Sequence, residues 1–138
     1  MVVTTSHRWL IDKSAYARLG SCAHPEVWAN RIQHGLIHIC TPTVLELGYS
    51  ARSAEDWSLI MQQSPMSLMP IEYATPHIES RAREVQGLLA RRGEHRAPSV
   101  PDLLIAATAE LTGLVVLHAD KDFDAIGNIT GQEAEWLT

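Results

Sequence analysis

The sequence predicts an α/β sandwich built around a mostly parallel sheet, and three observations support this fold class. Short apolar runs recur at residues 9–11, 36–40 and 114–117, each with the length of a buried strand. Stretches with helical spacing of apolar residues separate these runs, as in successive βαβ units. The chain has 138 residues, 46% of them hydrophobic and 20% charged, which predicts one globular domain spanning 1–138.

The first third of the chain alternates between predicted strands and helices. Ser14 follows the strand at 9–11 and is a candidate N-cap for a short helix. Pro25 begins a second helix, because proline suits the first helical turn, and Gly35 ends it. The strand at 36–40 comes next.

The middle of the chain is expected to be mainly helical. Pro42 is expected to end the preceding strand, so the next helix covers about 43–50. Residues 54–63 also have helical spacing, and Pro65 ends that segment. The segment 71–76 is ambiguous between strand and loop.

The last part of the chain begins with the clearest amphipathic helix, which ends at Gly93. Its apolar stripe consists of Ile78, Ala82, Val85 and Leu89. A further helix is expected from Ser99 to Leu111, and Gly113 ends it. The β-branched strand at 114–117 then leads to Asp120.

Composition excludes several classes of protein. Eleven Lys and Arg against sixteen Asp and Glu give a net charge of −5, which argues against a generic nucleic-acid binder. The charge is uneven, since residues 81–96 carry five arginines and two glutamates. No apolar stretch is long enough for a membrane span, and 1–7 does not resemble a signal peptide. With only two cysteines, a cytoplasmic protein with reduced thiols is expected.

Four acidic residues are expected to meet at one edge of the sheet. Asp12 and Asp120 each follow an apolar strand, and ligands of open α/β sheets bind beyond the carboxyl ends of the strands. Glu46 and Asp102 are expected in the first turns of helices that begin at the same edge. Taken singly, each acid has a structural explanation. Glu46 and Asp102 fit capping boxes with Thr43 and Ser99, and the other two could cap turns.

Taken together, the four carboxylates favour a metal site. Glu46 and Asp102 precede apolar residues and are expected close to the core, where unpaired carboxylates are costly. Hard cations with a preference for oxygen ligands, Mg²⁺ or Mn²⁺, would offset their repulsion. A nucleic-acid strand could then approach an otherwise acidic surface.

Four segments that contain these acids resemble motifs of the PIN-domain ribonucleases, and most closely of the VapC-type toxins of bacterial toxin–antitoxin modules. They are LIDKSA at 10–15, PTVLEL at 42–47, PDLLIAA at 101–107 and HADKDF at 118–123. The resemblance covers nearly the whole chain. It implies a single PIN-like domain, a three-layer α/β/α sandwich with a mostly parallel central sheet.

The resemblance also implies roles for individual residues. Asp12, Glu46, Asp102 and Asp120 correspond to the metal-binding acidic quartet, and Ser14 to a hydroxyl near it. Asp122 is a candidate fifth ligand, whereas Asp124 has a structural role. Lys13 replaces a small hydroxyl residue, and either reaches substrate phosphate or faces solvent.

The activity implied by the resemblance is hydrolysis of structured RNA, such as tRNA, by a metal-activated water that leaves a 5′-phosphate. Implied partners are the RNA substrate, a VapB-type antitoxin and a second copy of the chain in a homodimer. Arginines of the basic segment could hold phosphates. The candidates are Arg81, Arg91, Arg92 and Arg96, whereas Arg83 falls opposite the apolar stripe and is expected to be solvated.

Three alternatives remain open at this point. The same fold could bind RNA or a partner protein without hydrolysis, for which the unusual Lys13 is the only support. A phosphatase with Asp12 as nucleophile would leave Glu46 unexplained. Zinc ligands could come from Cys22, His24, His38 and Cys40, but the one-residue gaps are too short for common sites, so core cysteines and surface histidines are expected.

Overall fold

The computed structural model describes residues 7–138, and its sheet has the strand order β3-β2-β1-β4-β5 with every pair parallel. The strands are β1 (Trp9–Ile11), β2 (Ile37–Cys40), β3 (Ile71–Glu72), β4 (Val115–His118) and β5 (Ala134–Trp136). The helices are α1 (Lys13–Tyr16), α2 (Pro25–Gln33), α3 (Thr41–Tyr49), α4 (Ala54–Gln62), η1 (Met66–Leu68, a 3₁₀ helix), α5 (Pro76–Arg91), α6 (Val100–Thr112) and α7 (Asp124–Thr130). The expected α/β fold with a parallel sheet is confirmed.

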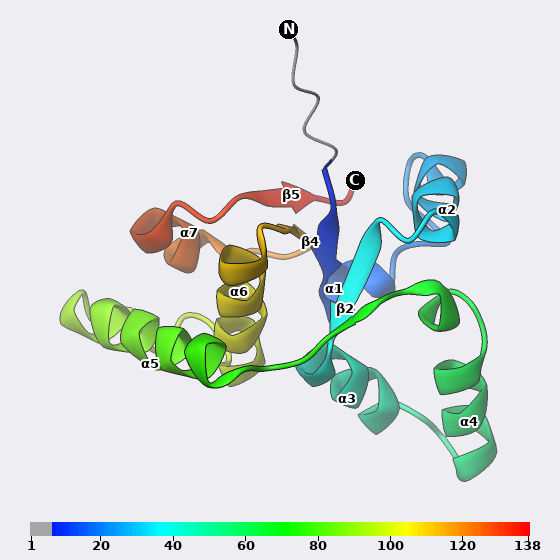
Figure 1. Ribbon diagram of the computed structural model, residues 1–138, viewed down its shortest axis with the longest axis horizontal. Helices are drawn as coiled ribbons and strands as arrows, with labels where there is room; N and C mark the ends of the chain where they lie inside the picture. The colour runs from blue at the N-terminus through cyan, green and yellow to red at the C-terminus, as the bar shows by residue number, and fades with distance from the viewer. Residues whose placement is uncertain (1–6) are drawn as a thin grey trace, which may run out of the picture.

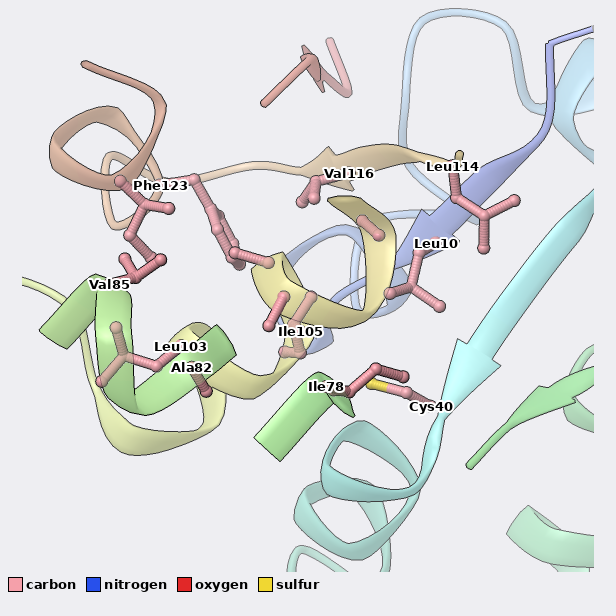
Figure 2. Packing of buried hydrophobic residues seen from close by; sticks show 14 of the residues in the cluster. Leu10, Cys40, Ile78, Ala82, Val85, Leu103, Ile105, Leu114, Val116 and Phe123 are labelled. Carbon is pink, nitrogen blue, oxygen red and sulfur yellow. The ribbon is translucent and has the colours of Figure 1, made fainter. Parts of the chain in front are cut away.

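Helices cover both faces of the sheet and form a three-layer sandwich (Figure 1). α5, α6 and α7 pack on one face, where their apolar side chains surround Leu10 and Val116 (Figure 2). α1 and α2 contribute to a second core on the opposite face, which includes Trp9 and Ile11. Leu10 points away from its two neighbours because side chains alternate between the faces of a strand. No helix within residues 7–138 has the length and apolar character needed to cross a membrane.

The order of the strands determines which segments of the chain meet at the carboxyl edge of the sheet. β1 lies between β2 and β4, so the carboxyl ends of these three parallel strands meet at one edge of the sheet. α3 begins where β2 ends (Figure 1). α6 precedes β4 and returns the chain to its start, which places the first turn of α6 at the same edge.

Two helix starts differ from the sequence-based expectation. Ser14 does not cap α1, because Asp12 is the N-cap and its carboxylate accepts the N–H of Ala15 at 2.9 Å. α3 begins at Thr41, earlier than expected, with Pro42 in its first turn and no side-chain cap. Proline lacks the N–H that the first turn would leave unpaired, so it favours this helix start as well as the end of a strand.

Several other elements agree with the prediction from the sequence, whereas some were not predicted. The stripe of α5 is buried as expected, and it consists of Ile78, Ala82, Val85 and Leu89. α6 begins with the expected capping box between Ser99 and Asp102 and ends at Gly113, whose φ of 71° is left-handed. The ambiguous segment at 71–76 contains the two-residue strand β3. α7 and β5 were not expected.

Candidate metal and nucleic-acid site

Five carboxylates gather at the carboxyl edge of the sheet and form what we call the acidic cluster. Its members are Asp12, Glu46, Asp102, Asp120 and Asp122. Asp120 is close enough that its negative charge contributes to a raised pKa at each of the other four. The structure therefore brings together residues from α3, from α6 and from the segments that follow β1 and β4, as the sequence suggested.

Asp12 is the most buried member, with 4% of its surface exposed. Burial raises the pKa of its carboxyl group to about 6, and the charge of Asp120 acts in the same direction. Hydrogen bonds from the Ala15 N–H and the Ser14 hydroxyl, together with the His118 charge, lower this pKa and only partly offset the effect. A cation beside Asp12 would favour the ionised form.

Ser14 links the two strand ends that carry acids. Its Oγ lies 2.8 and 2.9 Å from the carboxylate oxygens of Asp12, to which it donates. The same oxygen accepts the backbone N–H of Ala119 at 2.9 Å. Ser14 therefore connects the segment after β1 to the segment after β4 and holds Asp12 near Asp120.

Asp102 combines a capping role with a place in the acidic cluster. Its Oδ2 accepts the N–H of Ser99 at 3.0 Å, while the Ser99 hydroxyl accepts the N–H of Asp102 at 3.3 Å. Only 7% of Asp102 is exposed, and burial raises its pKa although both Ser99 interactions lower it. The capping role expected for Asp102 is therefore confirmed. The same carboxylate also lies within the acidic cluster, so the two roles are compatible.

Glu46 lies in the second turn of α3, so the capping explanation proposed for it is wrong. Burial raises the pKa of Glu46, and the charges of Asp102 and Asp120 raise it further. The ammonium group of Lys13 opposes this and lowers the pKa. Lys13 is exposed, as expected if its side chain faces solvent. Its charge nevertheless lies close enough to Glu46 to lower the pKa of that carboxyl group.

The segment after β4 supplies two members of the cluster. Oδ1 of Asp120 accepts the N–H of Asp122 at 2.9 Å, which fixes a tight turn. Asp122 is exposed, and burial and the charges of Asp120 and Asp102 still raise its pKa. Asp124 is exposed in the first turn of α7, which suits the structural role expected for it.

Sequence reasoning missed His118, the last residue of β4. Its buried ring packs against Trp136, with ring centroids 5.1 Å apart, and Nδ1 donates to the Asp120 carbonyl at 2.7 Å. His118 therefore supports the backbone that carries Asp120. The available signal was its position at the end of an apolar strand, two residues before an acid.

The donor set of the acidic cluster suits a hard divalent cation. All five side chains offer carboxylate oxygens, which Mg²⁺ and Mn²⁺ prefer. Within residues 7–138, no ion pair involves any of the five. The charge of Lys13 moderates the repulsion at Glu46, and the charge of His118 moderates it at Asp12 and Asp122. In the same range, no group of three His, Cys, Asp or Glu side chains stands in an arrangement that could hold an ion, so a bound ion would have to draw the carboxylates together.

The arginines of the basic segment differ in their surroundings. Arg81 makes two hydrogen bonds to Glu110 on α6, at 3.0 Å each, and pairs with Glu84 on its own helix. Its guanidinium group therefore joins two helices, which disfavours the phosphate-binding role considered for it. The other candidates are exposed, and they are Arg91, Arg92 and Arg96; Arg83 is also exposed, as expected.

The cysteines and histidines considered as zinc ligands have other partners. Cys40 is buried, and Cys22 donates to the Leu19 carbonyl at 3.4 Å. His24 is at the surface, as expected, but His38 is buried and its Nδ1 lies 2.9 Å from Glu72 on β3. The expectation of a surface His38 is therefore wrong, because its place in the second strand puts it inside the fold.

Comparisons with known proteins identify the family to which the chain is similar. The PIN domain family model matches residues 11–129. Ribonuclease VapC2 from Mycobacterium tuberculosis (strain CDC 1551 / Oshkosh) is 60% identical over 97% of this chain and 95% of its own length. Ribonuclease VapC51 from M. tuberculosis (strain ATCC 25618 / H37Rv) is 38% identical over 94% of this chain and 93% of its own.

Solved structures show the same fold at low sequence identity. DNA-bound VapBC from Salmonella typhimurium matches with a TM-score of 0.74 and 20% identity, covering 94% of this chain and 98% of that one. VapBC-1 from nontypeable Haemophilus influenzae matches with a TM-score of 0.71 and 17% identity, covering 93% and 96%. From the family model and the sequence relatives, the chain belongs to the PIN-domain family, among the VapC ribonucleases.

Proposed function

We propose that the protein is an endoribonuclease toxin that depends on Mg²⁺ or Mn²⁺, held by Asp12, Glu46, Asp102 and Asp120, with Asp122 as an additional ligand. The observation that carries this proposal is the gathering of carboxylates whose pKa values are raised by burial and by mutual repulsion, which the charges of Lys13 and His118 offset only in part. Such a cluster is unfavourable unless a cation binds to it.

A bound divalent ion would lower the pKa of an attacking water and balance negative charge on the scissile phosphate. The chain's own residues prepare for this in distinct ways. Ser14 keeps the Asp12 carboxylate in place, and the turn at Asp120 and Asp122 orients the acid after β4. Lys13, beside Glu46, can attract an RNA phosphate toward the cluster.

The substrate proposed is structured RNA, such as tRNA, cleaved to leave a 5′-phosphate. The exposed arginines at the end of α5 and in the following loop would contact phosphates away from the cleavage point, and they are Arg91, Arg92 and Arg96. Arg81 is omitted because it is paired with Glu110.

The proposed partners follow from the family. The solved neighbours include VapBC complexes, and we propose that a VapB-type antitoxin neutralises this protein and that the chain forms a homodimer. An RNA-cleaving toxin would meet its substrate in the cytoplasm, where we expect it to act.

The quartet is tested by comparing Asp12→Asn and Asp102→Asn with Asp124→Asn as a matched control. Each change removes one carboxylate charge with little change in volume, but Asp124 lies outside the cluster. We expect the first two variants to lose at least about a hundredfold in RNA cleavage, since replacing even a group that only hydrogen-bonds to a metal ligand costs tenfold to a hundredfold. Asp124→Asn should cleave as the wild type does. Wild-type cleavage by both cluster variants, with folding confirmed by circular dichroism, would reject the assignment.

A further inference from the structure

Lys13 places a positive charge at one end of the acidic cluster. It directly follows Asp12 and begins α1, whose start is held by the hydrogen bond from the Ala15 N–H to the Asp12 carboxylate at 2.9 Å. Lys13 and Glu46 line one groove at this edge of the sheet, and the charge of Lys13 lowers the pKa of Glu46. The Lys13 ammonium group therefore lies at the Glu46 end of the cluster.

Backbone hydrogen bonds already engage one oxygen of three of the acids. Oδ1 of Asp12, Oδ2 of Asp102 and Oδ1 of Asp120 each accept a backbone N–H, at 2.9, 3.0 and 2.9 Å. Within residues 7–138, the second oxygen of each of these acids has no backbone donor. Mg²⁺ is usually held by one or two carboxylates and keeps several waters, so these three oxygens are enough for one ion.

A site for two divalent ions makes larger demands on its ligands. The two ions of such a site lie about 4 Å apart and repel each other, so they need carboxylates that bridge them and offset their charge. In this chain, Glu46 is the acid whose charge Lys13 already balances in part. A second divalent ion beside Glu46 would meet the like charge of Lys13 in addition to that of the first ion.

We propose that the Lys13 ammonium group takes the place of a second divalent cation at the Glu46 end of the acidic cluster, so that the chain binds one ion and not two. The inference rests on the proposed function and specifies the composition of its metal site. Glu46 has two oxygens, so it can offer one to the ion and the other to Lys13. An ammonium group can also balance charge on a phosphate oxygen, which agrees with the attraction of RNA proposed for Lys13.

Lys121, the other lysine of the chain, provides a matched control. It directly follows Asp120, as Lys13 follows Asp12, and its side chain is also exposed. Its charge is not among the causes of the raised pKa values in the cluster. Lys121→Met therefore removes the same charge from the same edge of the sheet without changing the balance at Glu46.

The first test counts the Mn²⁺ ions bound by the full chain in the absence of RNA. Electron paramagnetic resonance measures free Mn²⁺ during a titration at pH 8, where Asp12 is ionised, with the protein above the dissociation constant. We expect one ion per chain for the wild type, for Lys13→Arg and for Lys121→Met. Lys13→Met keeps a long side chain without its charge and should bind two ions, whose spectrum should be that of a magnetically coupled pair.

The second test measures thermal melting in EDTA. Without metal, the charge of Lys13 should offset part of the repulsion at Glu46 and so stabilise the folded chain. Lys13→Met should melt below Lys121→Met by on the order of 2 °C, the size expected for a partly exposed charge interaction. Equal melting temperatures would mean that Lys13 does not balance the cluster, and the inference would be overturned.

The outcomes separate this inference from the proposed function. If the wild type binds no Mn²⁺, the metal-dependent function is wrong, and the role of Lys13 with it. If the wild type binds two ions, or if Lys13→Met still binds one, only the role assigned to Lys13 is wrong. Two ions bound by Lys13→Arg would show that positive charge at this position does not exclude the second ion, and this result would also overturn the inference.

Discussion

Folding places the Asp12 carboxyl group where its ionised form is unfavourable. Burial raises its pKa from 3.8 to about 6, despite the hydrogen bonds from Ala15 and Ser14. Between these two pH values the folded state holds a proton that the unfolded state has released, so the free energy of unfolding falls as pH rises. Above pH 6 the ionised carboxylate lowers that free energy by about 3 kcal/mol.

Asp12→Asn should therefore stabilise the protein in the absence of metal. An amide oxygen can still accept the Ala15 N–H and cap α1, but it carries no charge. In EDTA we expect the variant to melt several degrees above the wild type at pH 8, with a smaller difference at pH 5. Differential scanning calorimetry at both pH values measures this. A variant that melts below the wild type at both would mean that capping by the carboxylate outweighs its burial.

The sequence was enough to predict which acids belong to the cluster. It was not enough to predict the side chains and backbone groups that surround each acid. An apolar run that stops at Asp12, and another that leads to Asp120, mark strand ends without any structure. The capping box at Asp102 was also visible, since it depends on local spacing alone. The position of Glu46 was misjudged because Pro42 was assigned to the end of a strand and not to a helical turn. His118 was missed because its role depends on contacts with Trp136 and the Asp120 carbonyl.

At the scale of elements, the arginines of α5 and the following loop divide into two groups. Arg81→Ala should lower the free energy of unfolding by about 1 kcal/mol, because it removes a half-buried double hydrogen bond between α5 and α6. RNA cleavage by this variant should be nearly unchanged. Thermal melting and cleavage kinetics check both statements.

The exposed arginines should behave in the opposite way. A variant with Arg91→Ala, Arg92→Ala and Arg96→Ala should melt as the wild type does, because none of these side chains is buried. Its KM for RNA should rise, and KM should depend less steeply on salt, because fewer phosphates are neutralised. If Arg81→Ala shows the larger effect on KM, the division between structural and RNA-binding arginines is wrong.

Elements with a buried face were predictable, and short exposed ones were not. The stripe of α5 repeats over four buried residues and predicts the helix directly. α7 buries only Ile126, and the three residues of β5 are all exposed, so neither has a periodic apolar pattern. β3 has two residues and becomes a strand only through its pairing with β2. These elements depend on neighbours far away in the sequence.

At the scale of the whole molecule, the strand order creates the site. β1 is central, and β2 and β4 flank it although about 75 residues separate them in the sequence. The parallel arrangement brings acids from four distant segments to one edge. The resulting concentration of negative charge opposes folding, binding of RNA and full ionisation of Asp12 alike. A divalent cation would relieve all three effects, which makes metal dependence the central claim.

The most direct measurement of that claim is cleavage of purified tRNA by the full chain, with added Mg²⁺ or Mn²⁺ and with EDTA. We expect cleavage with either ion, none in EDTA, recovery when excess Mg²⁺ is restored, and 5′-phosphate ends on the products. Asp12→Asn, assayed in parallel with Mg²⁺, should leave the tRNA intact. Undiminished cleavage in EDTA would contradict the account.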